Sequence, residues 1–169
     1  MRTMSEHPWK LAEATKRLGD AADQVDIIET LRQYARRASG ADGIAVICRE
    51  GAMVTYVAED ALGRLWTGQR FVIRHCISGL AILERAPILI PDTLADPRVP
   101  QAVYAATFVR GMAMFPIGAP EPSMALGGYW AKPNALDPAA LEMLEELAAL
   151  ATQALKRIAL SMPGARLAG

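Results

Sequence analysis

The first quarter of the chain carries apolar residues at alternating steps of three and four. The repeat consists of Leu11, Ala14, Leu18, Ala21, Val25 and Ile28. This spacing places the residues along one helix face, and no proline interrupts it between residues 10 and 38. Gly19 and Asp20 weaken the pattern, which therefore predicts two helices, or one helix with a weak joint.

From there to residue 130, short apolar runs alternate with turn residues. The runs that predict strands are residues 44–48, 52–59, 88–90, 109–117 and 124–130. Glu50 and Gly51 supply a hairpin turn between the first two strands. Residues 60–74 are irregular and predict a long excursion over the sheet. Residues 78–85 and 99–108 predict short helices.

The clearest element is a long amphipathic helix near the end of the chain. Asp137 is a good N-cap, Pro138 suits the first helical position, and apolar residues then recur at helical spacing as far as Leu160. The order of elements predicts an α+β fold with an antiparallel sheet covered on at least one face. The expected division is an N-terminal helical extension, one domain and a flexible tail, over residues 1–24, 25–160 and 161–169.

Composition and charge restrict the classes of function. Of the 169 residues 52% are apolar, and 18 Lys and Arg balance 18 Asp and Glu. Because zero net charge offers no basic face for a phosphate backbone, we expect no nucleic-acid partner. No apolar run approaches the roughly 20 residues that span a bilayer, and the first eight residues do not read as a signal peptide. We therefore expect a cytoplasmic protein with no membrane partner.

The second half of the chain carries a series of motifs in a specific order. They are Ile77-Ser78-Gly79-Leu80-Ala81, Pro87-Ile88-Leu89-Ile90-Pro91-Asp92, Asp96-Pro97-Arg98, residues 108–117 and Ala125-Leu126-Gly127-Gly128-Tyr129-Trp130. Together they resemble the GAF domain, over residues 25–160. Cys76-Ile77-Ser78-Gly79 is most similar to the subgroup found as sensor domains of bacterial two-component histidine kinases. Gly111 departs from the pattern, since many members have Ser at that point.

The resemblance implies a GAF (PAS-like) fold, with terminal helices packed on one face of a central antiparallel sheet and a ligand pocket on the other. The excursion before Cys76 and residues 92–108 would cover that pocket. The implied function is small-molecule binding or redox sensing in bacterial signal transduction, with no enzymatic activity. The output would pass to a signalling partner protein in trans, or the chain would be part of a sensor kinase. The ligand stays unidentified.

Nine residues on the walls and cover of this implied pocket are candidate ligand contacts. They are Trp66, Phe71, His75, Cys76, Tyr104, Phe108, Arg110, Met112 and Met114. A mostly apolar cavity with few polar groups is typical of small-molecule sites. Taken singly, each of the large apolar residues is better explained as filling the domain core.

Cys76 combines reactive chemistry with a place just before a predicted helix. Unpaired backbone amides and the helix dipole favour a thiolate there, and His75 and Arg74 are adjacent, so a redox-sensing or ligand-contacting thiol is one interpretation. The preferred interpretation is a small buried hydrophobe, as free cysteines usually are. This holds more strongly for Cys48, which lies inside an apolar run.

The cofactors known from GAF relatives fit this sequence poorly. A haem would need His75 as its axial ligand, with Phe108, Met112, Met114 and Tyr129 as lining, yet a lone histidine beside a loop more often bonds a carbonyl. Covalent bilin attachment is not expected, because no cysteine lies at or beyond residues 99–108. The signature of cyclic-nucleotide GAF domains is also missing around residues 132–134.

Two other functions compete with the regulatory one. A GAF-type free methionine sulfoxide reductase would need two or three cysteines converging on the pocket, and Cys48 is badly placed for that. A structural dimerisation module with a collapsed pocket is the other alternative. We expect a homodimer in any case, because the two terminal helical seams exceed what one sheet needs and such helices pair with their twins in GAF sensors.

Overall fold

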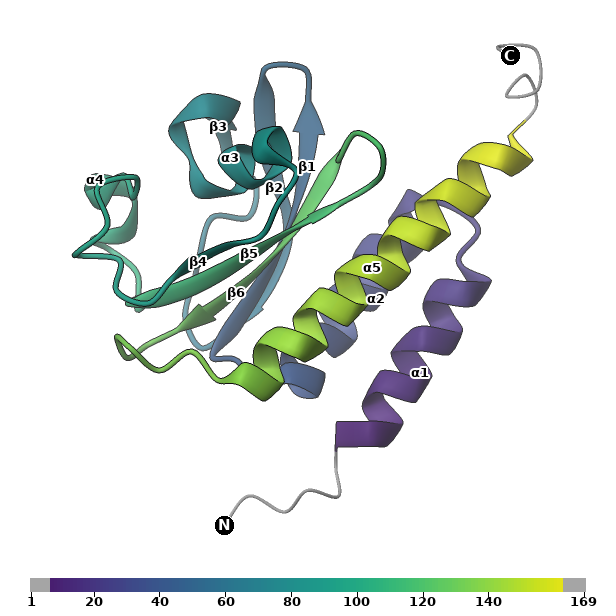
Figure 1. Ribbon diagram of the computed structural model, residues 1–169, viewed down its shortest axis with the longest axis horizontal. Coiled ribbons are helices and arrows are strands. Elements are labelled where there is room, and N and C mark those ends of the chain that lie inside the picture. The colour runs from purple at the N-terminus through teal and green to yellow at the C-terminus, as the bar shows by residue number, and fades with distance from the viewer. Residues whose placement is uncertain (1–6, 163–169) are drawn as a thin grey trace.

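The computed structural model describes residues 7–162, with side chains from residue 11 onward, as a sheet between two covering layers (Figure 1). Its six strands pair antiparallel throughout, in the order β3-β2-β1-β6-β5-β4. The strands are β1 (Gly43–Glu50), β2 (Met53–Ala61), β3 (Arg70–Val72), β4 (Ile88–Ile90), β5 (Gly111–Ile117) and β6 (Met124–Trp130). The helices are α1 (His7–Asp20), α2 (Gln24–Ser39), α3 (Ile77–Glu84), α4 (Gln101–Tyr104) and α5 (Pro138–Ser161). The predicted α+β class with an antiparallel sheet is confirmed.

Two segments differ from the sequence prediction. Residues 60–74 are not an irregular excursion throughout, because β3 pairs there with β2 and is followed by a 3₁₀ turn, η1 (Ile73–His75). Residues 99–108 contain one helical turn instead of a longer helix. The Thr107 amide and hydroxyl both donate to the Tyr104 carbonyl and close that turn.

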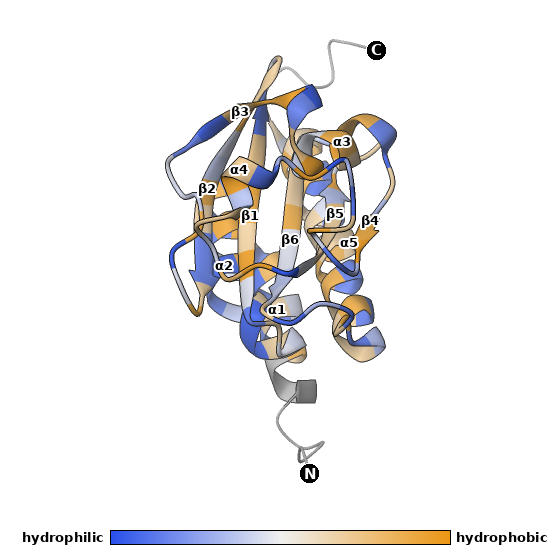
Figure 2. Ribbon diagram, turned by 90° about the vertical axis from the view of Figure 1, so that its left-hand side faces the viewer, coloured by the Kyte–Doolittle hydropathy of each residue, from blue (hydrophilic) through white to orange (hydrophobic). Residues whose placement is uncertain are grey.

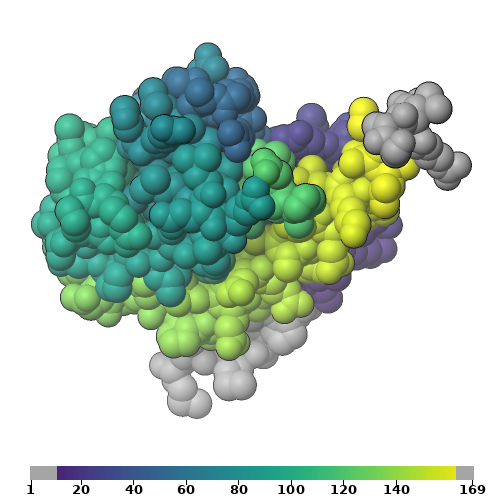
Figure 3. Space-filling model, turned by 45° about the horizontal axis from the view of Figure 1, so that its top comes forward, coloured from purple at the N-terminus to yellow at the C-terminus, as the bar shows by residue number. Residues whose placement is uncertain are grey.

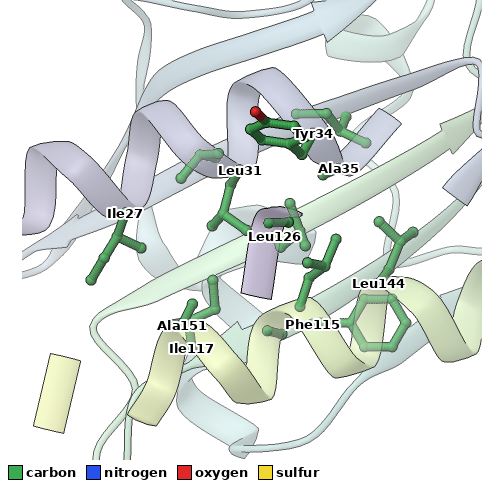
Figure 4. Packing of buried hydrophobic residues seen from close by; sticks show 14 of the residues in the cluster. Ile27, Leu31, Tyr34, Ala35, Phe115, Ile117, Leu126, Leu144 and Ala151 are labelled. Atoms are coloured by element: carbon green, nitrogen blue, oxygen red, sulfur yellow. The ribbon is translucent and has the colours of Figure 1, made fainter. Parts of the chain in front are cut away.

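The helix layer consists of α2 and α5 on the sheet and of α1 packed across both of them (Figure 1). Asp23 caps α2 by accepting a hydrogen bond from the Asp26 amide, so the helical region breaks close to the predicted joint. The Arg157 guanidinium of α5 donates to the carbonyls of Leu18 and Ala21 and holds that joint. Figure 4 shows α2 and α5 side chains meeting those of the sheet.

The apolar seam of α1 is covered within the same chain. Ala14, Leu18 and Ala21 are buried against α2 and α5. The apolar faces of the terminal helices favoured pairing with a second copy. Part of this apolar surface is therefore already buried within one protomer. The homodimer stays a prediction that needs a different surface. Of the predicted flexible tail, residues 161–169, Ser161 still belongs to α5, and residues 163–169 lie outside the described part of the chain.

Strand side chains alternate between the two faces, so the sheet separates two hydrophobic cores. Figure 2 shows that the central strand β1 is hydrophobic along most of its length. The helix-side core includes Ile44, Val46, Ala58, Ala113, Phe115, Leu126 and Trp130 of the sheet, and Leu31, Leu144 and Ala151 of the helices. The pocket-side core includes Ala45, Ile47, Val54, Tyr56, Met112, Met114, Ala125 and Tyr129 of the sheet, and Leu65, Trp66, Cys76, Ile77 and Tyr104 of the cover.

An irregularity in the hairpin decides which β2 residues reach which core. The register pairs Val46 with Ala58 but Ile47 with Tyr56, so one extra residue, Val57, bulges from β2. As a result Tyr56 points into the pocket-side core, while Val57 and Ala58 pack toward the helices. The bulge thus turns a large polar side chain toward the face that the family resemblance assigns to a ligand.

Candidate functional site

The face of the sheet opposite the long helices is covered by α3, α4 and the loops around them. In the space-filling view these segments, coloured blue to teal, form a continuous layer on one side of the molecule (Figure 3). Side chains fill the space beneath this layer. Met112, Met114 and Tyr129 of the sheet are fully buried there, and Trp66 of the cover is 3% exposed. The implied ligand pocket is therefore closed by the protein's own side chains.

Trp66 occupies the centre of this face. Its ring contacts three tyrosines edge to face, with centroid distances of 4.7 Å to Tyr104, 5.4 Å to Tyr56 and 5.5 Å to Tyr129. The indole Nε1–H donates to the Val103 carbonyl over 3.2 Å. Trp66 lies in the loop between β2 and β3, so a side chain of the covering layer packs into the centre of the site.

One carboxylate holds the loop that carries Trp66. Glu59 accepts hydrogen bonds from the Leu65 amide at 2.8 Å, from the Thr67 amide at 2.9 Å and from the Thr67 hydroxyl. Burial by itself would raise the pKa of Glu59, but these hydrogen bonds outweigh it and lower the pKa below the ordinary value. Ionised Glu59 therefore clamps the residues on both sides of Trp66.

Hydroxyl and thiol groups lie among the apolar side chains of the pocket-side core. Tyr56 Oη is 3.2 Å from Ser78 Oγ, and Cys76 Sγ is 3.5 Å from the same oxygen. Tyr104 donates weakly to the Met112 sulfur at 3.6 Å. Burial raises the pKa of all three tyrosines well above the ordinary value, so these hydroxyls stay protonated. The site therefore offers neutral hydrogen-bonding groups.

Tyr129 is the one hydroxyl of this group left without a partner. It is fully buried beside Tyr56 and Tyr104; the Tyr56 hydroxyl is near enough to affect its pKa, but no described residue makes a well-directed hydrogen bond to its oxygen. Its ring folds back over Gly127 of its own strand, where an added Cβ would lie 2.5 Å from the hydroxyl. On the other face of β6, a Cβ on Gly128 would lie 2.5 Å from Leu144 of α5 and 3.2 Å from Trp130.

Cys76 does not show the features of a reactive thiolate. Burial raises the pKa of its thiol, and the contact with Ser78 only partly offsets this. The Sγ–H points to the carbonyls of Val72 and Ile73 at 3.6 and 3.9 Å, and the effect of the Gly79 amide in the first turn of α3 on the thiol pKa is smaller than that of burial. This upward shift of the Cys76 pKa is opposite to the shift expected for a redox sensor at a helix N-terminus.

Five of the remaining candidate residues lie in the pocket-side core or at its edge. Tyr104, Met112 and Met114 are buried in the pocket-side core, as the resemblance implied. Phe71 and Phe108 are half-buried at its edge.

His75 and Arg110 do not join the core. His75 is exposed, so an axial haem ligand at this position does not fit the site. The Arg110 guanidinium lies 3.6 Å from the Asp92 carboxylate and is 39% exposed.

Two polar residues of the site could not be singled out from the sequence. Tyr56 alternates with apolar residues in a strand, and only the bulge shows which face it takes. Ser78 is part of the Cys76-Ile77-Ser78-Gly79 motif, yet its contact with Tyr56 joins segments 22 residues apart. Within residues 7–162, no cluster of three or more metal-ligating side chains is found, and no helix is long and apolar enough to cross a bilayer.

Comparisons with known proteins agree on the fold. The family model described as GAF domain matches residues 21–156. No curated protein matches the chain. A solved structure of a free methionine-R-sulfoxide reductase from Neisseria meningitidis with its substrate superposes with a TM-score of 0.74 at 13% identity, covering 90% of this chain and 89% of its own.

Two signalling-related structures are equally similar. The GAF domain of a phosphoenolpyruvate-protein phosphotransferase from Acinetobacter gives a TM-score of 0.76 at 11% identity, over 96% of this chain and 99% of its own. The chromophore-binding domain of a bacteriophytochrome from R. palustris gives 0.76 at 16% identity, over 95% and 64%. At such identities the likeness concerns the fold alone.

The reductases correct the expectation that the chain is not an enzyme. The same fold supports free methionine-R-sulfoxide reduction in several solved structures, so enzyme status is open. The two cysteines of this chain lie in different cores, Cys48 on the helix side and Cys76 on the pocket side. With the sheet between them, these two thiols do not converge in this conformation. A turnover assay with free methionine-R-sulfoxide and a thiol reductant decides the question.

Proposed function

Because the chain belongs to the GAF domain family, with residues 21–156 matching the family model, we propose that it is a regulatory module that binds a small molecule on the pocket side of its sheet. The bound molecule would change how the helix layer packs, and a signalling partner would read that change. The finer assignment, to a sensor domain of a bacterial histidine kinase or a module acting on one in trans, rests on Cys76-Ile77-Ser78-Gly79 alone.

The observation that carries this proposal is the contrast between the two cores. On the helix side, the buried hydroxyls of Thr30 and Ser39 donate to carbonyls of their own helix, and the oxygen without a partner belongs to a half-buried residue, Thr55 of β2. On the pocket side, Tyr56 and Ser78 bond to each other and Tyr129 bonds to nothing described. A buried unsatisfied hydroxyl costs roughly 1–3 kcal/mol. A face that only had to fill a core would gain stability from phenylalanine there, whereas a binding face needs the hydroxyl.

Native mass spectrometry of the purified full chain tests this function. We expect a noncovalent small-molecule mass in addition to the protein, and a rise in the thermal denaturation midpoint when the molecule is restored after removal. Ser78→Ala should weaken binding, whereas Ser39→Ala, at a buried serine on the other face, should not. A chain that carries no ligand from cells, and whose midpoint no metabolite in a broad panel raises, would contradict the proposal.

We also propose the homodimer, now on the outward face of α5. This face is acidic at Glu142, Glu145 and Glu146 and basic at Lys156, and a shallow hollow runs along it past Ala149. Glu142 and Lys156 each lie seven residues from Ala149. An antiparallel pair of α5 helices with its two-fold axis at Ala149 would place each Glu142 opposite the other copy's Lys156.

Charge reversal tests this interface. Glu142→Lys should shift the chain toward monomer in sedimentation at low salt, and Glu142→Lys combined with Lys156→Glu should restore the dimer. A wild-type monomer at high protein concentration, or a double variant no better than the single one, would rule this arrangement out.

A further inference from the structure

We propose that the pocket accepts an uncharged, flat molecule that takes the place of the Trp66 indole and bonds to the Tyr129 hydroxyl. The inference rests on the proposed function and names the chemical class of the ligand. Three features of the pocket-side core carry it: its lack of charge, the way Trp66 is held, and the unpaired Tyr129 oxygen.

The first feature is charge. Within the described part of the chain, every buried residue of the pocket-side core is apolar or carries a neutral polar group. Of the charged candidates at its edge, Glu59 holds the loop amides and His75 is exposed. Arg110 has its charge paired with Asp92 at 3.6 Å, although its buried Nε–H has no partner among the described residues. A carboxylate, phosphate or ammonium placed here would be buried without a counterion, which is strongly unfavourable. The ligand that fits is neutral.

The second feature is the shape and attachment of Trp66. Its indole is enclosed by three tyrosine rings at centroid distances of 4.7 to 5.5 Å, so the space it fills is flat and aromatic-lined. Two of the three tyrosines belong to the paired strands β2 and β6, and the third, Tyr104, belongs to α4. Trp66 belongs to a loop whose nearest amides are clamped by one side chain, Glu59, while the Gly68 amide bonds to the Tyr56 carbonyl. Release of the Glu59 bonds would let the indole leave as a unit.

The third feature is the Tyr129 hydroxyl. It is 0% exposed and has no partner among the described residues. The rings of Trp66 and Tyr129 are 5.5 Å apart, so a molecule in the place of the indole lies next to this oxygen. Departure of the indole also frees the Val103 carbonyl that its Nε1–H had bonded. A ligand with one acceptor for Tyr129 and one donor for Val103 satisfies both groups.

Three probes of the same shape and different charge test the class of ligand: indole, indole-3-carboxylate and tryptamine. In the full-length Trp66→Ala chain, where the space is already emptied, indole should bind and raise the thermal midpoint. The anion and the cation should bind at least tenfold more weakly. 7-Azaindole, which has the shape of indole and adds a ring-nitrogen acceptor, should bind more tightly than indole; Tyr129→Phe should weaken 7-azaindole about tenfold, the loss expected for one hydrogen bond, and Tyr34→Phe in the helix-side core should not. If Trp66→Ala does not fold, Trp66→Leu takes its place.

The wild-type chain tests displacement. The side-chain N–H resonance of Trp66 is identified by its loss in Trp66→Phe. This resonance should shift and lose its protection from hydrogen exchange once enough free indole has been added to reach the maximal rise in the thermal midpoint. A charged probe that binds as tightly as indole, or a Trp66 resonance that stays unchanged at saturation, would overturn the inference. A charged ligand found on the wild-type chain from cells would overturn it while leaving the proposed function intact. Binding of indole by Trp66→Ala alone, with no ligand for the wild type, would count against both.

Discussion

Replacing Gly79 by alanine isolates the closest backbone contact of the pocket cover. Gly79 lies in the first turn of α3, and a Cβ there would be 1.8 Å from the Ile73 carbonyl oxygen and 2.6 Å from its carbon. Both neighbours are backbone atoms of η1, so no side chain can rotate away and the turn itself must move. Overpacking of this kind costs about 1–3 kcal/mol, and a backbone clash belongs at the upper end. The better helix propensity of alanine returns about 0.5–1 kcal/mol.

We therefore expect Gly79→Ala to lower the free energy of unfolding by about 2–2.5 kcal/mol, or the thermal midpoint by roughly 4–10 °C for a chain of this size. Urea denaturation followed by circular dichroism measures it. The control is Gly19→Ala in α1, where nothing lies within 4 Å of the new Cβ, so the same substitution should stabilise by up to about 1 kcal/mol. A Gly79→Ala chain as stable as the wild type, or both variants shifting in the same direction, would refute the packing argument.

Three further predictions concern the loop clamp, the helix joint and the thiols. Glu59→Gln should destabilise the chain by about 1 kcal/mol at pH 7. Because the pKa of Glu59 is lowered in the folded state, its contribution to stability is present above the unfolded pKa near 4.5 and is lost as the pH falls through the folded pKa. The free energies of unfolding of the two proteins, measured in urea, should therefore converge in acid, and a difference that stays constant with pH would contradict the clamp. Arg157→Ala, which removes both hydrogen bonds to the carbonyls of Leu18 and Ala21, should cost about 1 kcal/mol and speed hydrogen exchange in α1, while Arg37→Ala at an exposed position of α2 should do neither. Because burial raises the pKa of both cysteines, iodoacetamide at pH 7 should label Cys48 and Cys76 slowly until the chain is unfolded, and rapid labelling of Cys76 in the native state would revive a reactive thiol.

Local pattern was enough to predict most of the elements. The hairpin around Gly51, the three later strands and the long helix from Pro138 all carry strong local signals: alternation, turn residues and a proline at the first helical position. β3 gave no such signal, because Arg70-Phe71-Val72 has no uninterrupted apolar run, whereas the equally short β4 is wholly apolar and lies between Pro87 and Pro91. The order of motifs, which no single element contains, was what identified the family.

The candidate site could be predicted only in outline. Trp66, Tyr104, Met112 and Met114 were placed on the correct face, because the resemblance fixed the fold and alternation fixed the strands. The role of Tyr56 depends on one bulged residue, and bulges have no reliable sequence signal.

The closure of the face and the coverage of α1 depend on long-range packing. Trp66 fills the site through contacts with Tyr104 and Tyr129, which lie 38 and 63 residues further along the chain. The apolar seam of α1 is covered by α2 and also by α5, which lies more than a hundred residues away in sequence. Periodicity in the sequence shows that an apolar helix or strand face must be buried, but it does not identify the element that covers it.

The two adjacent glycines of β6 place a limit on how this protein can vary. Each leaves on its own face of the sheet the room that a ring two positions later occupies, Tyr129 over Gly127 and Trp130 beside Gly128. Any descendant that acquires a side chain at residue 127 must shrink residue 129 in compensation, and with it give up the hydroxyl. A larger residue at position 127 should therefore occur only together with a smaller one at position 129.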